Sequence, residues 1–189
     1  MIMAMKRAVW IFILCIPAIA CGKDLQAIRA SEAACGQGKG HIRTEVLTGP
    51  EITPQIAPGQ SLVYFVNPST WFFIKVSIAA DGHWITELAA GSHFATAMQP
   101  GEHRLCVRLE RWQLGGPYIG LLHIDLQPAH TYYVRIWATS DNNPFDGGSS
   151  NGGSIVPQLE TVNADEGKFL VDATQARVLA GHGPAGGSR

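Results

Sequence analysis

From residue 41 onward, apolar and polar residues alternate with a period of two in one short segment after another. HRLCVRLE (103–110) is typical, with Leu105, Val107 and Leu109 on the inward face and Arg104, Cys106 and Arg108 on the outward face. Because successive side chains of a strand point to opposite faces of its sheet, this period predicts half-buried β-strands. The other predicted strands are HIRTEVL (41–47), SLVYFV (61–66), WFFIKVSIA (71–79), HWITELA (83–89), HFATAM (93–98), YIGLLHIDL (118–126), TYYVRIWA (131–138) and PQLETV (157–162).

Turn signals separate these strands. Asp81-Gly82, Ala90-Gly91 and Pro100-Gly101 each place a residue that accepts a positive φ between two apolar runs. Short strands that recur at roughly ten-residue spacing, with no β/α alternation, favour an all-β fold. We predict an antiparallel β-sandwich of about 7–9 short strands over residues 41–179.

The end of the predicted domain departs from the strand pattern. SDNNPFDGGSSNGGS (140–154) has no apolar period and predicts a flexible loop. NADEGKFLVDATQARVL (163–179) predicts a short helix, with Asn163 as N-cap and Asp165 and Glu166 in the first turn, where the helix dipole favours acids. Residues 180–189 are predicted to be a disordered tail.

The amino-acid composition mainly excludes other classes of protein. Of the 189 residues, 46% are hydrophobic and only 15% charged, which excludes a charge-driven disordered chain. The formal net charge is −1, and no basic run or stripe follows the first residues. The electrostatic footprint of a nucleic-acid binder is therefore missing, and no nucleic-acid partner is predicted.

Residues 1–20 have the three parts of a signal peptide. Lys6 and Arg7 form a positive start, residues 8–16 an apolar run, and Pro17-Ala18-Ile19-Ala20 puts small residues at the two positions that a signal peptidase reads. The apolar run is too short to span a bilayer comfortably as a mature helix. We therefore predict export, with residues 21–40 as a tether into the domain.

Cys21 directly follows this cleavage pattern. Ala18-Ile19-Ala20-Cys21 resembles a bacterial lipobox, in which the cysteine receives diacylglycerol, although Ala18 stands where Leu is usual. The same residues are equally a site for the ordinary signal peptidase. From this pattern two fates stay open: a lipid anchor at Cys21, or a soluble periplasmic or secreted protein.

The cysteine count favours the lipid anchor. Cys15 leaves with the leader, so lipidation of Cys21 would leave Cys35 and Cys106 as an even pair for a disulfide in an oxidising compartment. Without lipidation, one thiol is left over. A bond between Cys35 and Cys106 would close a loop of about 70 residues, contribute roughly 4 kcal/mol, and pin the N-terminal arm across the outward face that carries Cys106.

A succession of motifs from about residue 34 to residue 179 resembles the bacterial domain-of-unknown-function family numbered 2846. The motifs are ACG (34–36), APGQSLVYFV (57–66), ADGHWITELAAGSHFATAMQPGEHRLCV (80–107), LQPAHTYYVRI (126–136) and DEGKFLV (165–171). The resemblance implies a small β-sandwich on exported, often lipidated envelope proteins, and its hairpin segment is similar to the PEGA-type surface module. It implies no activity, so no catalytic residue is carried over.

The strongest candidate for a binding surface is a face of the 131–138 strand. Tyr133 and Trp137 share its outward side with Arg135 between them, which is suitable for a carbohydrate or a peptide. The competing interpretation is that the second sheet or the N-terminal arm covers this face, because sandwich strands that are covered on both sides are often apolar on both.

Five histidines raise the hypothesis of a metal site: His83, His93, His103, His123 and His130. A turn at 90–91 would set His83 opposite Met98, and a turn at 100–101 would set Met98 opposite His103, so the two histidines would flank Met98 about 10 Å apart. The chain has no HExxH and no CxxC, and GGSSNGG (147–153) lacks the strand-to-helix context of a nucleophile elbow. We predict no metal, no cofactor and no catalytic residue.

Taken as a whole, the sequence predicts an exported, lipid-anchored protein of the cell envelope with a binding or structural role. Its expected partners are the membrane, through the lipid on Cys21, and an envelope protein or glycan. One alternative is a carbohydrate- or peptide-binding module that uses Tyr133, Arg135 and Trp137. Another is a metal- or thiol-dependent enzyme that uses His83, His103 or Cys106, since a free thiol between two arginines would be activated.

Overall fold

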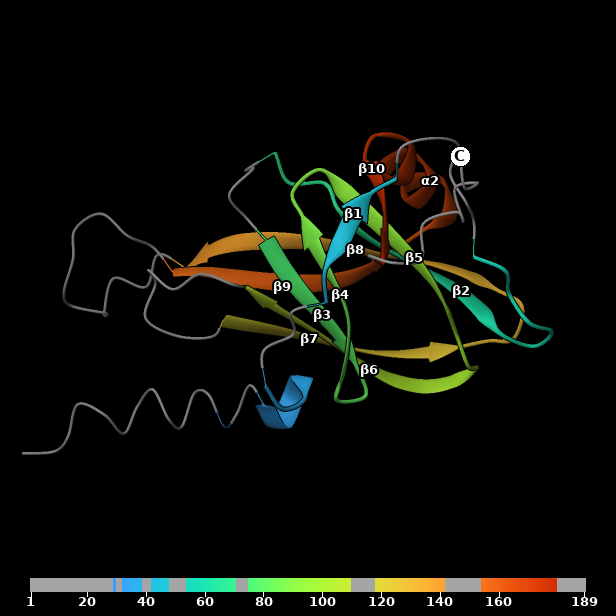
Figure 1. Cartoon of the computed structure of the whole chain (residues 1–189), viewed down its shortest axis with the longest axis horizontal. Coiled ribbons are helices and arrows are strands. Elements are labelled where there is room, and N and C mark those ends of the chain that lie inside the picture. The colour runs from blue at the N-terminus through green and yellow to red at the C-terminus, as the bar shows by residue number, and fades with distance from the viewer. Residues whose placement is uncertain are drawn as a thin grey trace, which may run out of the picture.

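A computed structural model of the chain describes residues 29, 32–38, 42–47, 54–70, 75–109, 118–141 and 154–179. In this part, ten strands stack as two facing sheets, residues 32–35 are helical, and a nine-residue helix follows β9 (Figure 1). The elements are β1 (Thr44–Val46), β2 (Ser61–Asn67), β3 (Lys75–Ala80), β4 (His83–Ala89), β5 (Ser92–Met98), β6 (Gly101–Leu109), β7 (Tyr118–Leu126), β8 (Thr131–Asp141), β9 (Ser154–Val162), α2 (Ala164–Asp172) and β10 (Gln175–Leu179). The predicted all-β sandwich is confirmed.

The two sheets have six and four strands. The larger has the order β1-β10-β5-β2-β8-β9 and the smaller β4-β3-β6-β7. Most neighbours are antiparallel, as predicted, but β2 pairs with β8 and β10 with β5 in parallel. A parallel pair needs a connection that crosses from one end of the sheet to the other. Alternation within single strands carries no information about such crossings, so the sequence did not predict them.

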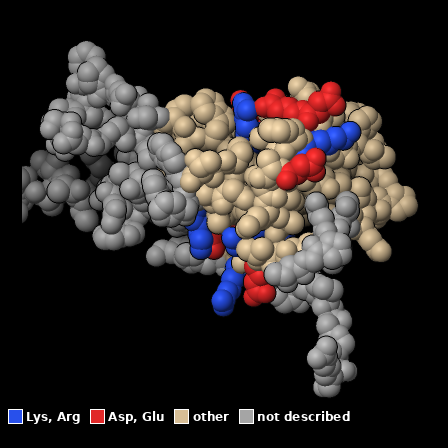
Figure 2. Space-filling view, turned by 90° about the horizontal axis from the view of Figure 1, so that it is seen from above, with Lys and Arg blue, Asp and Glu red and all other residues tan. Residues whose placement is uncertain are grey.

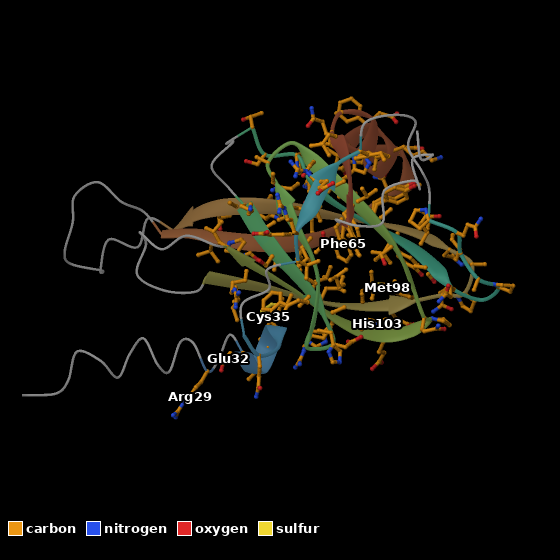
Figure 3. All side chains as sticks on the ribbon, in the orientation of Figure 1. Arg29, Glu32, Cys35, Phe65, Met98 and His103 are labelled. Carbon is orange, nitrogen blue, oxygen red and sulfur yellow. A yellow bond between two sulfur atoms is a disulfide. The ribbon has the colours of Figure 1, made fainter. Side chains whose placement is uncertain are left out.

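The core lies between the sheets and follows the predicted alternation. Leu105, Val107 and Leu109 are buried in it from β6, and Val134 and Ile136 from β8. β2 is buried along its whole length, because its second face is covered as well (Figure 3 labels Phe65 in the interior). That second face forms a smaller apolar cluster around Leu62, Tyr64 and Val66.

The turn at Ala90-Gly91 does not close the predicted hairpin between β4 and β5. It carries the chain from the four-stranded sheet to the six-stranded one, where β5 pairs with β2 over seven residues. The Ser92 hydroxyl closes the crossing by donating to the Ala89 carbonyl at 2.6 Å. Crossing over lets Phe94 and Met98 of β5 enter the core from the opposite sheet. The turn signal therefore marked where the chain bends but not which strand it joins.

The predicted helix over 163–179 is correct only in its first half. The Asn163 side chain caps α2 by accepting from the N–H groups of Asp165 and Glu166, as predicted. The helix ends at Asp172, and Gln175–Leu179 forms strand β10 instead. Strand β10 pairs with β1 and with the start of β5, so its backbone groups find their hydrogen-bond partners in the sheet instead of in a helix.

Several predicted segments lie wholly or largely outside the described residues. These are the leader (1–20), Cys21, the tail (180–189), most of the tether (21–40), and residues 142–153 of the predicted 140–154 loop. At the two ends of that loop, β8 continues to Asp141 and β9 begins at Ser154. Within the part of the chain that is described, no helix is long and apolar enough to cross a bilayer.

Candidate functional site

The N-terminal arm, residues 32–38, lies across the outer face of the four-stranded sheet (Figure 3). Its anchor is a disulfide between Cys35 and Cys106 of β6, whose Cα atoms are 5.3 Å apart and 71 positions apart in sequence. Both cysteines are buried, and they pack with Ala34 and Ala79 in a small apolar cluster. The predicted bond is therefore present, on the outward face that the alternation assigned to Cys106.

Polar contacts from three outward side chains hold the backbone of the arm. Arg104 donates to the carbonyl of Ala33 at 3.4 Å, and Arg108 donates to that of Gly38 at 3.1 Å. The Trp84 indole N–H donates to the carbonyl of Gln37 at 3.2 Å, and the Arg108 guanidinium lies 4.3 Å from the centroid of the Trp84 ring. Sequence reasoning put Arg104 and Arg108 beside Cys106 but did not identify the arm's carbonyls as their acceptors.

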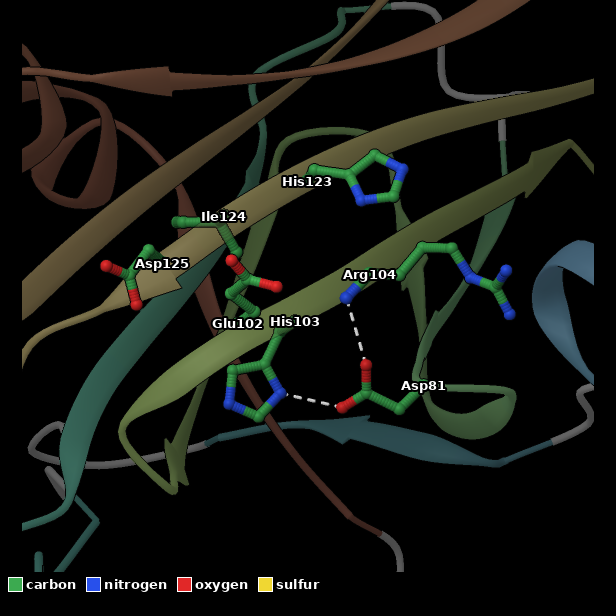
Figure 4. A pocket seen from close by; sticks show the side chains of 7 residues that line it. All are labelled: Asp81, Glu102, His103, Arg104, His123, Ile124 and Asp125. Atoms are coloured by element: carbon green, nitrogen blue, oxygen red, sulfur yellow. Dashed lines mark hydrogen bonds and ion pairs between the residues drawn. The ribbon is translucent and has the colours of Figure 1, made fainter.

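Beside the arm, the same face opens into a polar groove of about 650 Å³ (Figure 4). Its wall is formed by residues 102–104 of β6, residues 123–125 of β7 and the turn between β3 and β4, so it includes the inward residues His103 and Ile124 as well as outward ones. In register, Glu102 faces Asp125, so two carboxylates lie opposite each other, whereas Arg104 faces His123 and lies on the diagonal from Asp125. Directly opposed like charges are destabilising in a sheet, whereas the diagonal neighbours attract each other.

Asp81 and His103 form the fixed part of the groove. The His103 Nδ1 lies 2.6 Å from the Asp81 Oδ2, and its Nε2 lies 2.8 Å from the Gln99 carbonyl. Since both ring nitrogens face acceptors, the geometry suits the imidazolium, in which both donate. The Arg104 N–H donates to the other Asp81 oxygen at 2.9 Å. Asp81 has a φ of 52°, a left-handed conformation that Asp and Asn accept more readily than other non-glycine residues.

These contacts raise the pKa of His103 and lower the pKa of Asp81. Burial alone would lower the pKa of His103, but the hydrogen bonds to Asp81 and Gln99 and the charge of Asp81 raise it above 6.5. Burial alone would raise the pKa of Asp81, but the Arg104 N–H and His103 together hold it below 3.8. The pair therefore contributes its full stabilisation at pH values between 3.8 and 6.5, the ordinary pKa values of Asp81 and His103. The contribution is lost as the pH rises through the His103 pKa or falls through the Asp81 pKa.

We expect Asp81→Asn to lower the pKa of His103, because Asn keeps the left-handed turn and removes the charge. NMR titration of the imidazole ring protons measures this directly. The stability deficit of Asp81→Asn should be largest near pH 5–6 and should shrink above the raised pKa of His103. Asp125→Asn is the matched control: its carboxylate lies in the same groove but accepts from Gln127, so His103 should titrate as in the wild type. An unchanged His103 pKa in Asp81→Asn would contradict the proposed pairing.

The register proposed for His83, Met98 and His103 is wrong. Met98 lies on β5 in the six-stranded sheet and pairs with Ser61, whereas His83 pairs with Ala80 in the other sheet. β3, not β5, separates His83 from β6. Among the described residues, no three or more His, Cys, Asp or Glu side chains are placed to hold a metal ion.

The other histidines are dispersed. His93 is buried and contacts the Thr174 hydroxyl at 2.9 Å, while His130 at the β7–β8 turn contacts the Pro128 carbonyl at 2.8 Å. His123 lies in the groove, opposite Arg104. The structure thus brings His103 and His123 to one groove, which no sequence spacing indicated, because the two belong to different strands.

Helix α2 covers part of the predicted aromatic face. Tyr133 is buried under the helix and stacks on Tyr64, with ring centroids 5.3 Å apart. Arg135 is bound by Glu160 of β9 and by Glu166 of the helix, the latter at 2.6 Å. Trp137, further along the strand, is 41% exposed. Tyr133, Arg135 and Trp137 therefore do not form one open surface. The covering layer is the helix, not the second sheet or the arm.

No protein-family model matches this chain, and the curated proteins contain no match to it. The resemblance to the family numbered 2846 therefore stays a hypothesis.

On the side viewed in Figure 2, charged side chains lie in separate groups with wide uncharged stretches between them. This agrees with the low charged fraction of the sequence, 15%.

Proposed function

We propose that this protein is an exported, lipid-anchored domain of the cell envelope, with a binding or structural role and no catalytic one. The observation that carries the proposal is the pairing of Cys35 with Cys106. These are the two cysteines that remain if Cys15 is removed with the leader and Cys21 is lipidated. A buried disulfide of this kind forms and persists in oxidising compartments, which supports export.

The length of the N-terminal arm and its attachment to β6 also suit a membrane tether. Cys21 precedes Cys35 by about 14 residues, which span at most roughly 50 Å when extended. A lipid on Cys21 would thus be connected, through a covalent bond to β6, to the outer face of the four-stranded sheet. A pull on the tether would act on Cys106 in the middle of β6, which is hydrogen-bonded on both sides. This arrangement supports a domain held close to a membrane.

The lipid anchor is tested by the intact mass of protein extracted from membranes with detergent. We expect a diacyl or triacyl addition on a chain that begins at Cys21. Cys21→Ser should shift the protein from the membrane fraction to the soluble fraction, whereas Cys35→Ser should lose the disulfide and keep the lipid. An unmodified mature chain in the wild type would contradict the lipid anchor and favour a soluble periplasmic or secreted protein.

Within this role, we propose the β6–β7 groove as the surface that meets a polar envelope partner. Its charged side chains border the arm, so a bound partner would sit beside the tether. The leaderless domain serves as bait for envelope proteins and glycans, and a Glu102→Lys/Asp125→Lys variant should lose whatever the wild type captures. Glu45→Lys, on β1 of the other sheet, is the control. Equal capture by all three baits would contradict the use of this groove.

The alternative of a carbohydrate- or peptide-binding face now depends on Trp137. It is the one member of the predicted triplet with a largely open side chain, since Tyr133 is under α2 and Arg135 is engaged by two glutamates. A single exposed ring offers a stacking surface but little else. Loss of glycan capture in a Trp137→Ala bait, with capture retained by the groove variant, would favour this alternative.

A further inference from the structure

Strands β5 and β10 are neighbours in the six-stranded sheet for only a short stretch. The two strands pair only at Gln175↔Ser92 and Ala176↔His93, after which β10 turns away to pair with β1. A cavity of about 330 Å³ lies where they diverge, lined by residues 93–96 of β5 and 176–179 of β10. Leu47 and Pro54 also line it. This volume is within the range of small-molecule sites.

Most of the cavity wall is apolar. The apolar side chains are Leu47, Pro54, Phe94, Ala95, Ala176, Val178 and Leu179. One edge is polar, because the peptide groups of β5 turn toward β10. The Gly91 carbonyl accepts from the Gln175 N–H, so by the alternation of a strand the peptide groups of His93, Ala95 and Ala97 point to the same side. Beyond His93, no described residue of β10 pairs with them.

Among the described residues that line the cavity, Arg177 is the one Lys or Arg. Its side chain is half-buried and its Nε is fully buried, yet that Nε has no hydrogen-bond partner. The Arg177 side chain forms no hydrogen bond or ion pair with any residue that the structure describes, although its backbone pairs with Val46 of β1. Arg135 of the same sheet shows the ordinary arrangement, with two carboxylates around its guanidinium. A buried donor left without an acceptor destabilises a protein by an appreciable amount, which argues that an acceptor arrives from outside.

We propose that this cavity binds a small carboxylate with an apolar body. The Arg177 guanidinium holds the carboxylate, for which its planar set of donors is well suited. The apolar body lies between Phe94, Ala95 and the β10 side chains. Inorganic phosphate has no apolar part to fill the cavity, and a neutral hydrocarbon leaves the guanidinium unsatisfied. A free fatty acid and the C-terminus of an apolar peptide share the required chemistry. This site lies on the opposite sheet from the proposed groove, and it does not depend on the envelope role.

The probe is decanoate, added below its micelle concentration to the leaderless domain. We expect saturable binding, with shifts of the backbone NMR signals concentrated in residues 93–96 and 176–179. Decanol tests the apolar body without the charge, and acetate tests the charge without the body; each should bind at least about tenfold more weakly. A short apolar peptide with a free C-terminus, compared with its amidated form, distinguishes the peptide source from the fatty-acid source.

Arg177→Met should weaken decanoate binding about tenfold or more, since it keeps the length of the side chain and removes the donors. Arg43→Met is the control, because it makes the same change of net charge at an exposed residue outside the cavity. A second readout needs no ligand: removing the unsatisfied guanidinium should raise the Tm of the free domain by about 2–4 °C. Shifts spread over other surfaces, equal binding by decanol, or a lower Tm in Arg177→Met would each overturn the proposal.

Discussion

Replacing Cys35 with Ser is expected to lower the free energy of unfolding by about 4 kcal/mol. The disulfide closes a loop with a sequence separation of 71, so its removal restores a large amount of conformational entropy to the unfolded chain. The folded state loses contacts as well, because the arm then rests only on the hydrogen bonds to Trp84, Arg104 and Arg108. The apolar cluster around Ala79 would be exposed whenever the arm lifts.

Urea unfolding of the leaderless domain measures this effect. Cys35→Ser, Cys106→Ser and the double variant should have nearly equal stabilities, since either single change already removes the bond. Reduction of the wild type should reproduce the same loss. Faster hydrogen exchange of the Trp84 indole N–H would show that the arm has been released locally. Wild-type stability in all three variants would show that the bond contributes nothing to the fold.

Gly167→Ala is expected to destabilise the domain by about 1–3 kcal/mol, although Ala is the better helix former. Gly167 is a buried helical residue whose Cα faces the Tyr133 ring, and a Cβ there would collide with the ring carbons. Neither partner has room to yield, because Tyr133 is stacked on Tyr64 and α2 is tied to β8 through Glu166 and Arg135. The collision therefore outweighs a propensity gain of about 1 kcal/mol.

A double-mutant cycle separates these two effects. In a Tyr133→Ala background the collision is gone, so Gly167→Ala should stabilise by up to about 1 kcal/mol, reversing its sign. Lys168→Ala, the next residue on the exposed side of the helix, is the control and should change the stability little. Urea unfolding gives all four values. The same sign in both backgrounds would mean that packing on Tyr133 does not decide the effect of Gly167.

The candidate site was predictable to the extent that it lies on one strand. Alternation placed Arg104, Cys106 and Arg108 on one outward face, and the parity of the cysteines paired Cys106 with Cys35; both features are present. The groove was not predictable, because His123 and Asp125 come from β7 and Asp81 comes from a turn. Their proximity depends on the register between strands, which alternation within each strand does not specify.

The cover over the aromatic face and the true register of the histidines could not be predicted, for related reasons. The pattern of 131–138 correctly put Tyr133, Arg135 and Trp137 on the face opposite Val134 and Ile136. It could not show that α2 returns to cover half of that face. His83 and His103 were set around Met98 by counting back from two turns, but the chain changes sheets at both turns.

By itself, the amino-acid sequence determined the fold class, the inward residue of most strands, the cap of α2 and the disulfide. The fold class and the inward residues depend on local periodicity, the helix cap depends on one side chain, and the disulfide depends on the number of cysteines. Only the tertiary structure decided which strands are neighbours, where β10 replaces the end of a helix, and which side chains meet in the groove and in the cavity at Arg177. These features depend on the docking of two sheets. Docking is driven by the burial of apolar area, which is nearly indifferent to the order in which matching strands are joined.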